Sequence, residues 1–212
     1  MTDQKNEVRL AGTILGASRH ACAFFNTKDE EYRVLLPFIT EGFEQGDRAF
    51  HIIDEEHRPE HCQQLKRAGV PVDEAERTGQ LEIRRWEDAY LRDGHFDQHR
   101  MVALIEQVLQ GGKAEGYPLT RLVANMEWAL EDRPGVRDIV EYETRLNHVL
   151  PKFDDAVCCT YDLRRFSADV VMDIMRTHPM VIIGGILQEN PFFVPPDQML
   201  QELREREGLH VG

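Results

Sequence analysis

The residues best suited to chemistry in this chain lie in short apolar segments and in the turns that follow them. His20 and Cys22 are two residues apart in the segment 20–25, so both side chains face one side of an extended strand. Imidazole and thiolate are good metal ligands, but a site needs further ligands from elsewhere in the fold. We therefore keep His20 and Cys22 as candidate ligand-binding residues and assign no metal to them.

The turn after this segment has the wrong chemistry for binding phosphate. A phosphate loop needs glycines, which let the backbone approach the ligand, and a Lys-Ser/Thr pair at the start of the helix. Residues 26–31 read Asn-Thr-Lys-Asp-Glu-Glu, with no glycine and with three carboxylates at the start of the next helix. These carboxylates satisfy the helix dipole and repel a phosphate. The layout predicts a nucleotide-binding scaffold that has lost its phosphate site, which favours sensing over ATP hydrolysis.

Polar side chains also follow the other predicted strands. Ligands of open α/β sheets gather beyond the carboxyl ends of the strands, and these positions hold Asn26-Thr27, Asp54-Glu55, Glu127-Trp128 and Tyr161-Asp162. We expect Glu127 to orient a ligand, the alternative being a solvated carboxylate at a strand end. The space left by the lost loop is expected to be lined by Phe24, Phe25 and Trp128.

Other motifs argue against familiar catalytic or DNA-binding chemistry. His57 and His61, beside Cys62, have the i, i+4 spacing of a chelating pair, as do His95 and His99, but both regions are strongly polar and predict solvated histidines. There is no GxSxG elbow of a serine hydrolase and no zinc-finger or basic-helix pattern. We therefore predict that the chain is not an enzyme and needs no cofactor.

Composition narrows the class of protein further. The chain has 212 residues, of which 42% are hydrophobic, and 25 Lys+Arg against 38 Asp+Glu give a net charge of −13. This charge disfavours direct binding to nucleic acid or to an anionic membrane, but not to a basic protein. The polar start shows no signal peptide and no apolar run reaches the roughly 20 residues of a membrane span, so we expect a cytoplasmic protein. The four cysteines form no CxxC pair and are expected to be reduced and buried.

Short apolar segments alternate with helical patterns along the chain. The strands are expected at 20–25, 48–53, 81–84, 121–126, 156–161 and 180–185. Helices are expected at 29–45, 59–68, from 96 to a close at Gly111-Gly112, and at 136–150, 167–176 and 195–208, with a polar loop before Gly94. This alternation predicts a three-layer α/β fold with a mostly parallel sheet and an antiparallel edge strand near the C-terminus. Residues 1–15 form a tail or edge element, and 16–212 one domain.

Several segments, taken in order, resemble the MEDS domain, a sensory domain named for methanogens, methylotrophs and a dichloromethane-responsive regulator. They are 20–25 with Glu30-Glu31, Leu36 to Gly42, Asn125 to Trp128, Cys159 to Asp162, and Thr177 through Gly185 to Phe193. The resemblance implies a RecA/KaiC-like core without its phosphate loop. It also implies a sensor of small hydrocarbon derivatives that works beside DNA-binding, kinase or anti-sigma modules.

No such output module is evident in the sequence, so we expect signalling through a regulatory protein partner or through homo-oligomerisation. With the residues above, the resemblance gives the candidate ligand-binding set His20, Cys22, Phe25, Glu31, Glu127, Trp128, Tyr161, Asp162, His178 and Asn190. Two alternatives stay open. One is a scaffold that binds only protein, and the other is an ATPase-like protein with residual nucleotide binding.

Overall fold

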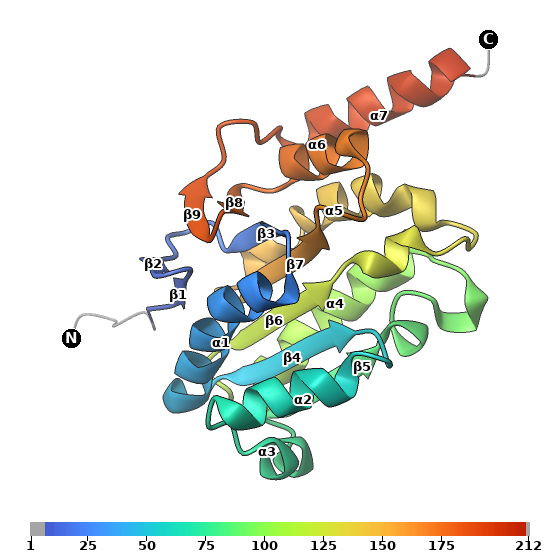
Figure 1. The fold of residues 1–212 in the computed structure, drawn as a ribbon. Coiled ribbons are helices and arrows are strands. Elements are labelled where there is room, and N and C mark those ends of the chain that lie inside the picture. Colours follow the sequence, from blue (N-terminus) through green and yellow to red (C-terminus); the bar gives the residue numbers. More distant parts are fainter. Residues whose placement is uncertain (1–6, 211–212) are drawn as a thin grey trace.

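The computed structural model describes residues 7–210 and is built around one seven-stranded sheet (Figure 1). The strand order is β5-β4-β6-β7-β3-β8-β9, with every neighbouring pair parallel except β8 and β9. The strands of this sheet are β3 (His20–Phe25), β4 (Arg48–Ile53), β5 (Leu81–Arg85), β6 (Thr120–Asn125), β7 (Ala156–Asp162), β8 (Met180–Ile183) and β9 (Ile186–Glu189). The expected antiparallel strand at the C-terminal edge is confirmed.

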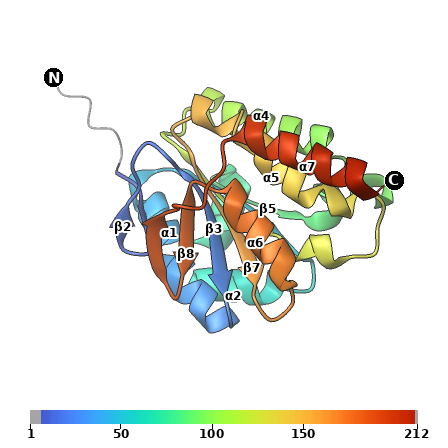
Figure 2. The same cartoon turned by 90° about the horizontal axis from the view of Figure 1, so that it is seen from above.

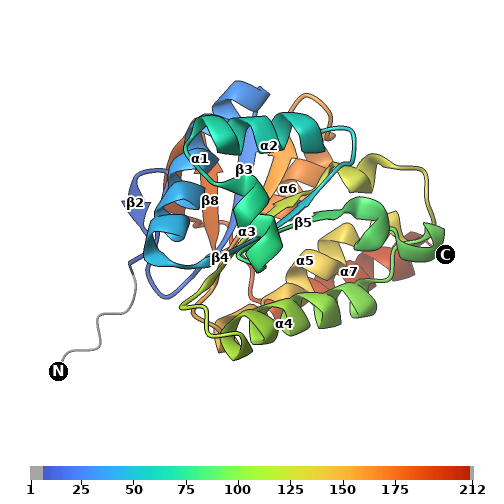
Figure 3. The ribbon, with the colours of Figure 1, turned by 90° about the horizontal axis from the view of Figure 1, so that it is seen from below.

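Helices cover both faces of the sheet and give the three layers predicted from the sequence. One face is covered by α1 (Lys28–Gln45), α2 (Arg58–Arg67) and α3 (Val72–Thr78). The other face is covered by α4 (Gln98–Ala114), α5 (Ile139–Leu146) and α6 (Ala168–Thr177), with α7 (Pro196–His210) beside α5 (Figures 2 and 3). A separate two-stranded ribbon, β1 (Arg9–Leu10) and β2 (Thr13–Ile14), precedes the sheet. No helix within residues 7–210 has the length and apolar character to cross a membrane.

The central strands are buried on both sides because their sequences lack the alternation of a half-exposed strand. All six residues of β3 and all six of β4 are buried, although each strand contains a histidine. Such near-continuous burial is typical of parallel strands between two helical layers. At the edge, Gly184 and Gly185 both have positive φ values, 59° and 75°, which allow the tight turn between β8 and β9.

The turn between β3 and α1 is closed by its own side chains. The hydroxyl of Thr27 accepts a hydrogen bond from the backbone N–H of Glu30 (3.1 Å). The carboxylate of Glu30 in turn accepts one from the backbone N–H of Asn26 (2.8 Å). These contacts occupy donors that a phosphate would use, as the three carboxylates in the turn predict.

A buried ion pair ties the far end of α1 to the sheet. The guanidinium of Arg121, at the start of β6, donates to Asp47 (2.8 Å), and both side chains are 1% exposed. The same guanidinium donates to Glu41 and to the backbone oxygen of Phe38 (2.8 and 2.7 Å). Burial raises the pKa of Asp47, although the Arg121 guanidinium opposes the shift. The pair fixes how α1 lies over β4 and β6.

Some expected boundaries are wrong. Gly111-Gly112 does not close the helix, which continues to Ala114. Gly112 is needed inside α4 because the helix passes Thr120 there, and a Cβ would overlap the Thr120 hydroxyl. The segment before Gly94 is not a polar loop, since its Trp86, Tyr90 and Leu91 are buried and it forms two short 3-10 turns. The helix expected at 136–150 is helical over Ile139–Leu146 between 3-10 turns, and α3 has no counterpart among the expected elements.

Candidate functional site

The predicted site residues separate into two groups on opposite sides of the sheet. One group surrounds the N-terminal end of α1, at the carboxyl ends of the strands, and we call it the strand-end pocket. The other is buried between β3, β7 and α5, and we call it the buried cluster; it consists of His20, Glu143, Cys159 and His178. The two sets differ in exposure and in chemistry.

Lys28 is the central charge of the strand-end pocket. Its ammonium group lies 2.9 Å from Glu31 and 3.3 Å from Glu127. Glu127 also accepts from Arg165 and from the side-chain amide of Asn125, and it is 3% exposed. Burial raises the pKa of Glu127, but Lys28, Asn125 and Arg165 outweigh it, so the net shift is downward. Glu127 is therefore a paired, buried carboxylate, and the alternative of a solvated strand-end residue is wrong.

Two adjoining cavities share Lys28, Glu31 and Asn125 in their walls. The larger has a volume of about 20 Å³ and is lined by apolar Leu35, Ile53 and Val123 and by polar Tyr32, Asp54, His57, Glu60 and His61. The smaller has a volume of about 10 Å³ and is lined by Phe25, Thr27, Glu127, Thr160, Tyr161 and Asp162. Each has room for about one water-sized molecule, so a larger ligand has to displace a side chain.

Two histidines, His57 and His61, line the larger cavity, and His51 lies behind His61. His51 Nδ1 lies 2.9 Å from His61 Nε2, and His61 Nδ1 lies 3.1 Å from the Tyr32 hydroxyl. Burial, and then the positive charges of Lys28 and Arg58, lower the pKa of His61 to about 4. The expectation that this histidine is solvated is wrong, because α2 turns His61 inward, where it is 4% exposed, whereas His99 is exposed as expected.

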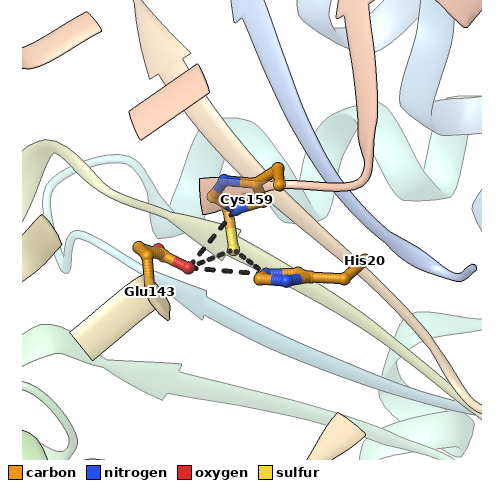
Figure 4. A group of neighbouring side chains, drawn as sticks. His20, Glu143 and Cys159 are labelled. Carbon is orange, nitrogen blue, oxygen red and sulfur yellow. Dashed lines mark hydrogen bonds and ion pairs between the residues drawn. The ribbon is translucent and has the colours of Figure 1, made fainter. Parts of the chain in front are cut away.

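The buried cluster brings together four side chains from four parts of the chain (Figure 4). Its ligand atoms all lie within 4.8 Å of one another, and no member is more than 3% exposed. Glu143 Oε2 lies 3.4 Å from His20 Nε2, 3.3 Å from His178 Nε2 and 3.8 Å from Cys159 Sγ. His20 begins β3, Cys159 lies in β7, Glu143 projects from α5, and His178 follows α6.

Outer hydrogen bonds hold these side chains in place. His20 Nδ1 lies 3.1 Å from Asn147 Oδ1, and His178 Nδ1 lies 2.9 Å from the backbone oxygen of Ile174. The second carboxylate oxygen of Glu143 accepts a hydrogen bond from the Tyr161 hydroxyl (2.9 Å). In both histidines Nδ1 therefore faces an acceptor, which leaves Nε2 directed at Glu143.

Burial perturbs every titrating group in the cluster. It lowers the pKa of His20 and raises the pKa of Cys159 to about 12. Burial alone would raise the pKa of Glu143 and lower that of His178. The two histidines outweigh burial at Glu143, and Cys22 and Glu143 outweigh it at His178, so these pKa values shift down and up respectively. When no further charged group is bound in the cluster, these shifts favour an ionised Glu143 beside a protonated His178.

The structure gives each remaining candidate a definite place. The thiol of Cys22 donates to the backbone oxygen of Met180 (3.7 Å), beside the buried cluster. Asp162 pairs with Arg164 (2.7 Å) at the strand-end pocket. The amide of Asn190 donates to the backbone oxygens of Met175 and His178, and so fixes the turn that carries His178.

The expected apolar lining of the strand-end pocket is correct for Phe25 alone. Phe24 faces the opposite side of β3 and packs against Tyr161, with ring centroids 5.6 Å apart. Trp128 is fully buried and stacks on Tyr90, with centroids 4.5 Å apart. Both belong to the aromatic core beneath α4 and α5, because alternate residues of a strand face opposite layers and the turn after β6 folds inward.

The candidate set predicted from the sequence does not include Glu143 or Cys159. Glu143 lies four residues after Ile139 and three before Leu146, on the apolar stripe of α5, and a carboxylate on such a stripe signals a buried polar partner. Cys159 is two residues before Tyr161 and shares its face of β7, but a cysteine in an apolar strand also fits plain burial.

Comparison with known proteins agrees with the fold and identifies the family. Residues 19–179 match the family model described as the methanogen/methylotroph, DcmR sensory domain, MEDS. The transcriptional repressor DcmR of Methylorubrum extorquens (strain DSM 6343 / CIP 106787 / DM4) is 25% identical over 173 residues, which are 81% of this chain and 62% of the repressor.

A solved structure resembles the fold over most of the chain. The KaiC-like protein PH0186 of Pyrococcus horikoshii OT3 superimposes with a TM-score of 0.57 at 17% identity, covering 81% of this chain and 73% of PH0186. At this identity the similarity concerns the fold alone, which is RecA/KaiC-like as expected. Because the family model covers residues 19–179, most of the chain, this protein belongs to the MEDS family of sensory domains.

Proposed function

We propose that this chain senses a small organic molecule, a hydrocarbon derivative of one or two carbons, which binds in the strand-end pocket. The observation that carries the proposal is the pair of adjoining cavities around Lys28, at the sheet edge where ligands of open α/β folds gather. The walls combine apolar and polar side chains, which suits a molecule with both characters. Volumes of about 20 and 10 Å³ favour a very small ligand.

The charges around the pocket argue against a nucleotide. Glu31, Asp54 and Glu60 line the larger cavity, and the start of α1 is capped by Thr27 and Glu30. Carboxylates near the site repel phosphate, and the backbone N–H groups of Asn26 and Glu30 already donate to side chains of the same turn. Non-enzymatic sensing therefore remains our prediction for this chain.

Signalling would follow from the displacement of a pocket side chain. Lys28 is 32% exposed and its side chain lines both cavities, so a ligand that moves it also breaks its ion pairs with Glu127 and Glu31. A ligand changes the conformation only through its different affinity for the two states. We propose that the altered surface at the start of α1 is read, in the cytoplasm, by a regulatory partner of DNA-binding, kinase or anti-sigma type.

A thermal-shift screen with matched variants tests this proposal. The full chain is melted with halomethanes, methylamines and short alcohols, and with Mg-ATP for comparison. At a concentration 100 times the Kd, a ligand stabilises the chain by about 2.7 kcal/mol, which raises Tm by about 5–11 °C. Leu35→Phe fills the larger cavity and should abolish the shift. Leu36→Phe, its neighbour outside the lining, should keep it.

The outcomes separate the three candidate functions. A shift with an organic compound that Leu35→Phe removes supports the sensor. A shift only with Mg-ATP supports residual nucleotide binding instead. If no compound moves Tm while a protein of known regulatory type binds the chain, the scaffold alternative replaces the sensor.

A further inference from the structure

The buried cluster has the geometry of a metal site rather than that of a direct ion pair. In a tetrahedral site the distance between two ligand atoms is about 1.6 times the metal–ligand bond, so zinc bonds of about 2.0–2.3 Å give edges of about 3.3–3.8 Å. Four of the six separations between the ligand atoms are 3.3, 3.4, 3.8 and 3.8 Å, and all six are within 4.8 Å. A charge-assisted hydrogen bond between imidazolium and carboxylate would be shorter, about 2.7–2.9 Å.

A second observation is an unused nitrogen. Within the described residues, Nε2 of His178 is fully buried and makes no hydrogen bond, although it points toward the carboxylate of Glu143. Its partner atom Nδ1 faces the backbone oxygen of Ile174, so in the neutral ring the lone pair is on Nε2. His20 is arranged in the same way by Asn147, whose own amide donates to three backbone oxygens. Two imidazole lone pairs thus converge on one point.

The outer hydrogen bonds are those that metal ligands use. Histidines bound to a metal donate their other N–H to a carbonyl or amide oxygen, and bound carboxylates are themselves hydrogen-bonded. Asn147, Ile174 and Tyr161 supply these three contacts at 3.1, 2.9 and 2.9 Å. A cavity of about 350 Å³, lined by His20, Asn147 and Pro179, leads from the amino edge of the sheet toward the cluster.

We propose that Nε2 of His20, Nε2 of His178, Sγ of Cys159 and Oε2 of Glu143 bind one divalent metal ion of the zinc class. Two neutral imidazoles, one thiolate and one carboxylate carry two negative charges, which neutralise the ion in a buried site. The thiol proton of Cys159 passes to solvent as the sulfur binds the metal. Four protein ligands make a closed, structural site that joins β3, β7, α5 and the turn before β8. The ligand atoms lie on the opposite face of the sheet from the larger strand-end cavity, and Tyr161 both lines the smaller cavity and donates to Glu143. Metal content tests this site, and the thermal-shift screen tests the strand-end pocket, so failure of one proposal is distinguishable from failure of the other.

Metal content and cobalt spectroscopy test the site directly. The full chain is purified without added chelator and then reconstituted with zinc or cobalt. We expect one ion per chain, visible bands of tetrahedral cobalt, and a thiolate-to-cobalt charge-transfer band in the near ultraviolet. Cys159→Ser should remove the charge-transfer band. Cys158→Ser is the matched control, because Cys158 is equally buried in β7 but faces the other layer.

A measurement on the unchanged chain covers the case in which Cys159→Ser fails to fold. X-ray absorption at the zinc edge should show one sulfur at about 2.3 Å together with nitrogen or oxygen at about 2.0–2.2 Å. Asn147→Ala should weaken zinc affinity about 10–100-fold, as loss of a contact to a ligating histidine usually does. A folded chain that takes up no stoichiometric metal, a metal shell without sulfur, or a cobalt band that survives in Cys159→Ser would overturn the proposal.

Discussion

The hydrogen bond from Tyr161 to Glu143 offers a sharp test of how the buried cluster is held. Both side chains are almost fully buried, at 1% and 0% exposed, and the hydroxyl lies 2.9 Å from Oε1. Tyr161→Phe keeps the ring and its packing but removes the donor. Hydrogen bonds to charged groups contribute about 1.5–3 kcal/mol, so we expect a loss of that size in the free energy of unfolding. For a chain of this length, the loss lowers Tm by about 3–12 °C.

Chemical denaturation in the presence of a chelator measures this loss without any contribution from bound metal. Tyr117→Phe is the control, because its hydroxyl makes only a long contact, 3.4 Å, to the backbone oxygen of Thr78. The control should stay within about 0.5 kcal/mol of the unchanged chain. If Tyr161→Phe also unfolds within about 0.5 kcal/mol of the unchanged chain, Glu143 does not depend on this donor and our description of the cluster is wrong.

Three further perturbations test other parts of the structure. Arg121→Met leaves Asp47 buried without its partner, and urea unfolding should show a loss of about 3–5 kcal/mol. The pKa of His61 in the folded chain is about 4, below its usual 6.5, so protonation of His61 favours the unfolded chain. The free energy of unfolding should therefore fall by about 3 kcal/mol as the pH falls from 7 to 4. His61→Gln should flatten that part of the pH profile. Gly112→Ala should lower Tm through a loss of about 1–3 kcal/mol, whereas Gly111→Ala, one position away with room for a methyl group, should not.

The sequence predicted most of the layers because their causes are local. Six predicted segments became the parallel strands and the first strand of the edge hairpin. The central strands β3, β4 and β6 are fully buried and need no alternation, whereas the edge strand β5 is partly exposed and alternates apolar and charged residues. The composition of residues 26–31 correctly indicated a helix start that caps itself. The glycine pair before Ile186 likewise predicted the hairpin turn.

Long-range packing decided the parts that local patterns could not predict. Gly112 in the sequence predicts the end of a helix, but it lies inside α4, where the absence of a side chain lets Thr120 of β6 approach closely. His20, Glu143 and His178 are distant in sequence, and only the fold places α5 over the start of β3. The sequence therefore identified two histidines of the buried cluster without identifying the cluster itself.

Solution NMR of the full chain tests the central claim, ligand binding in the strand-end pocket, most directly. We predict that a one- or two-carbon compound shifts the side-chain amide of Asn125 and the methyl groups of Val123 in a saturable way. The methyl groups of Ile174, buried on the opposite face, should not move. Lys28→Met should weaken the response, and Lys66→Met, an exposed lysine on α2, should not. Saturable shifts centred away from Asn125 and Val123, or none with any of the organic compounds, would contradict the account.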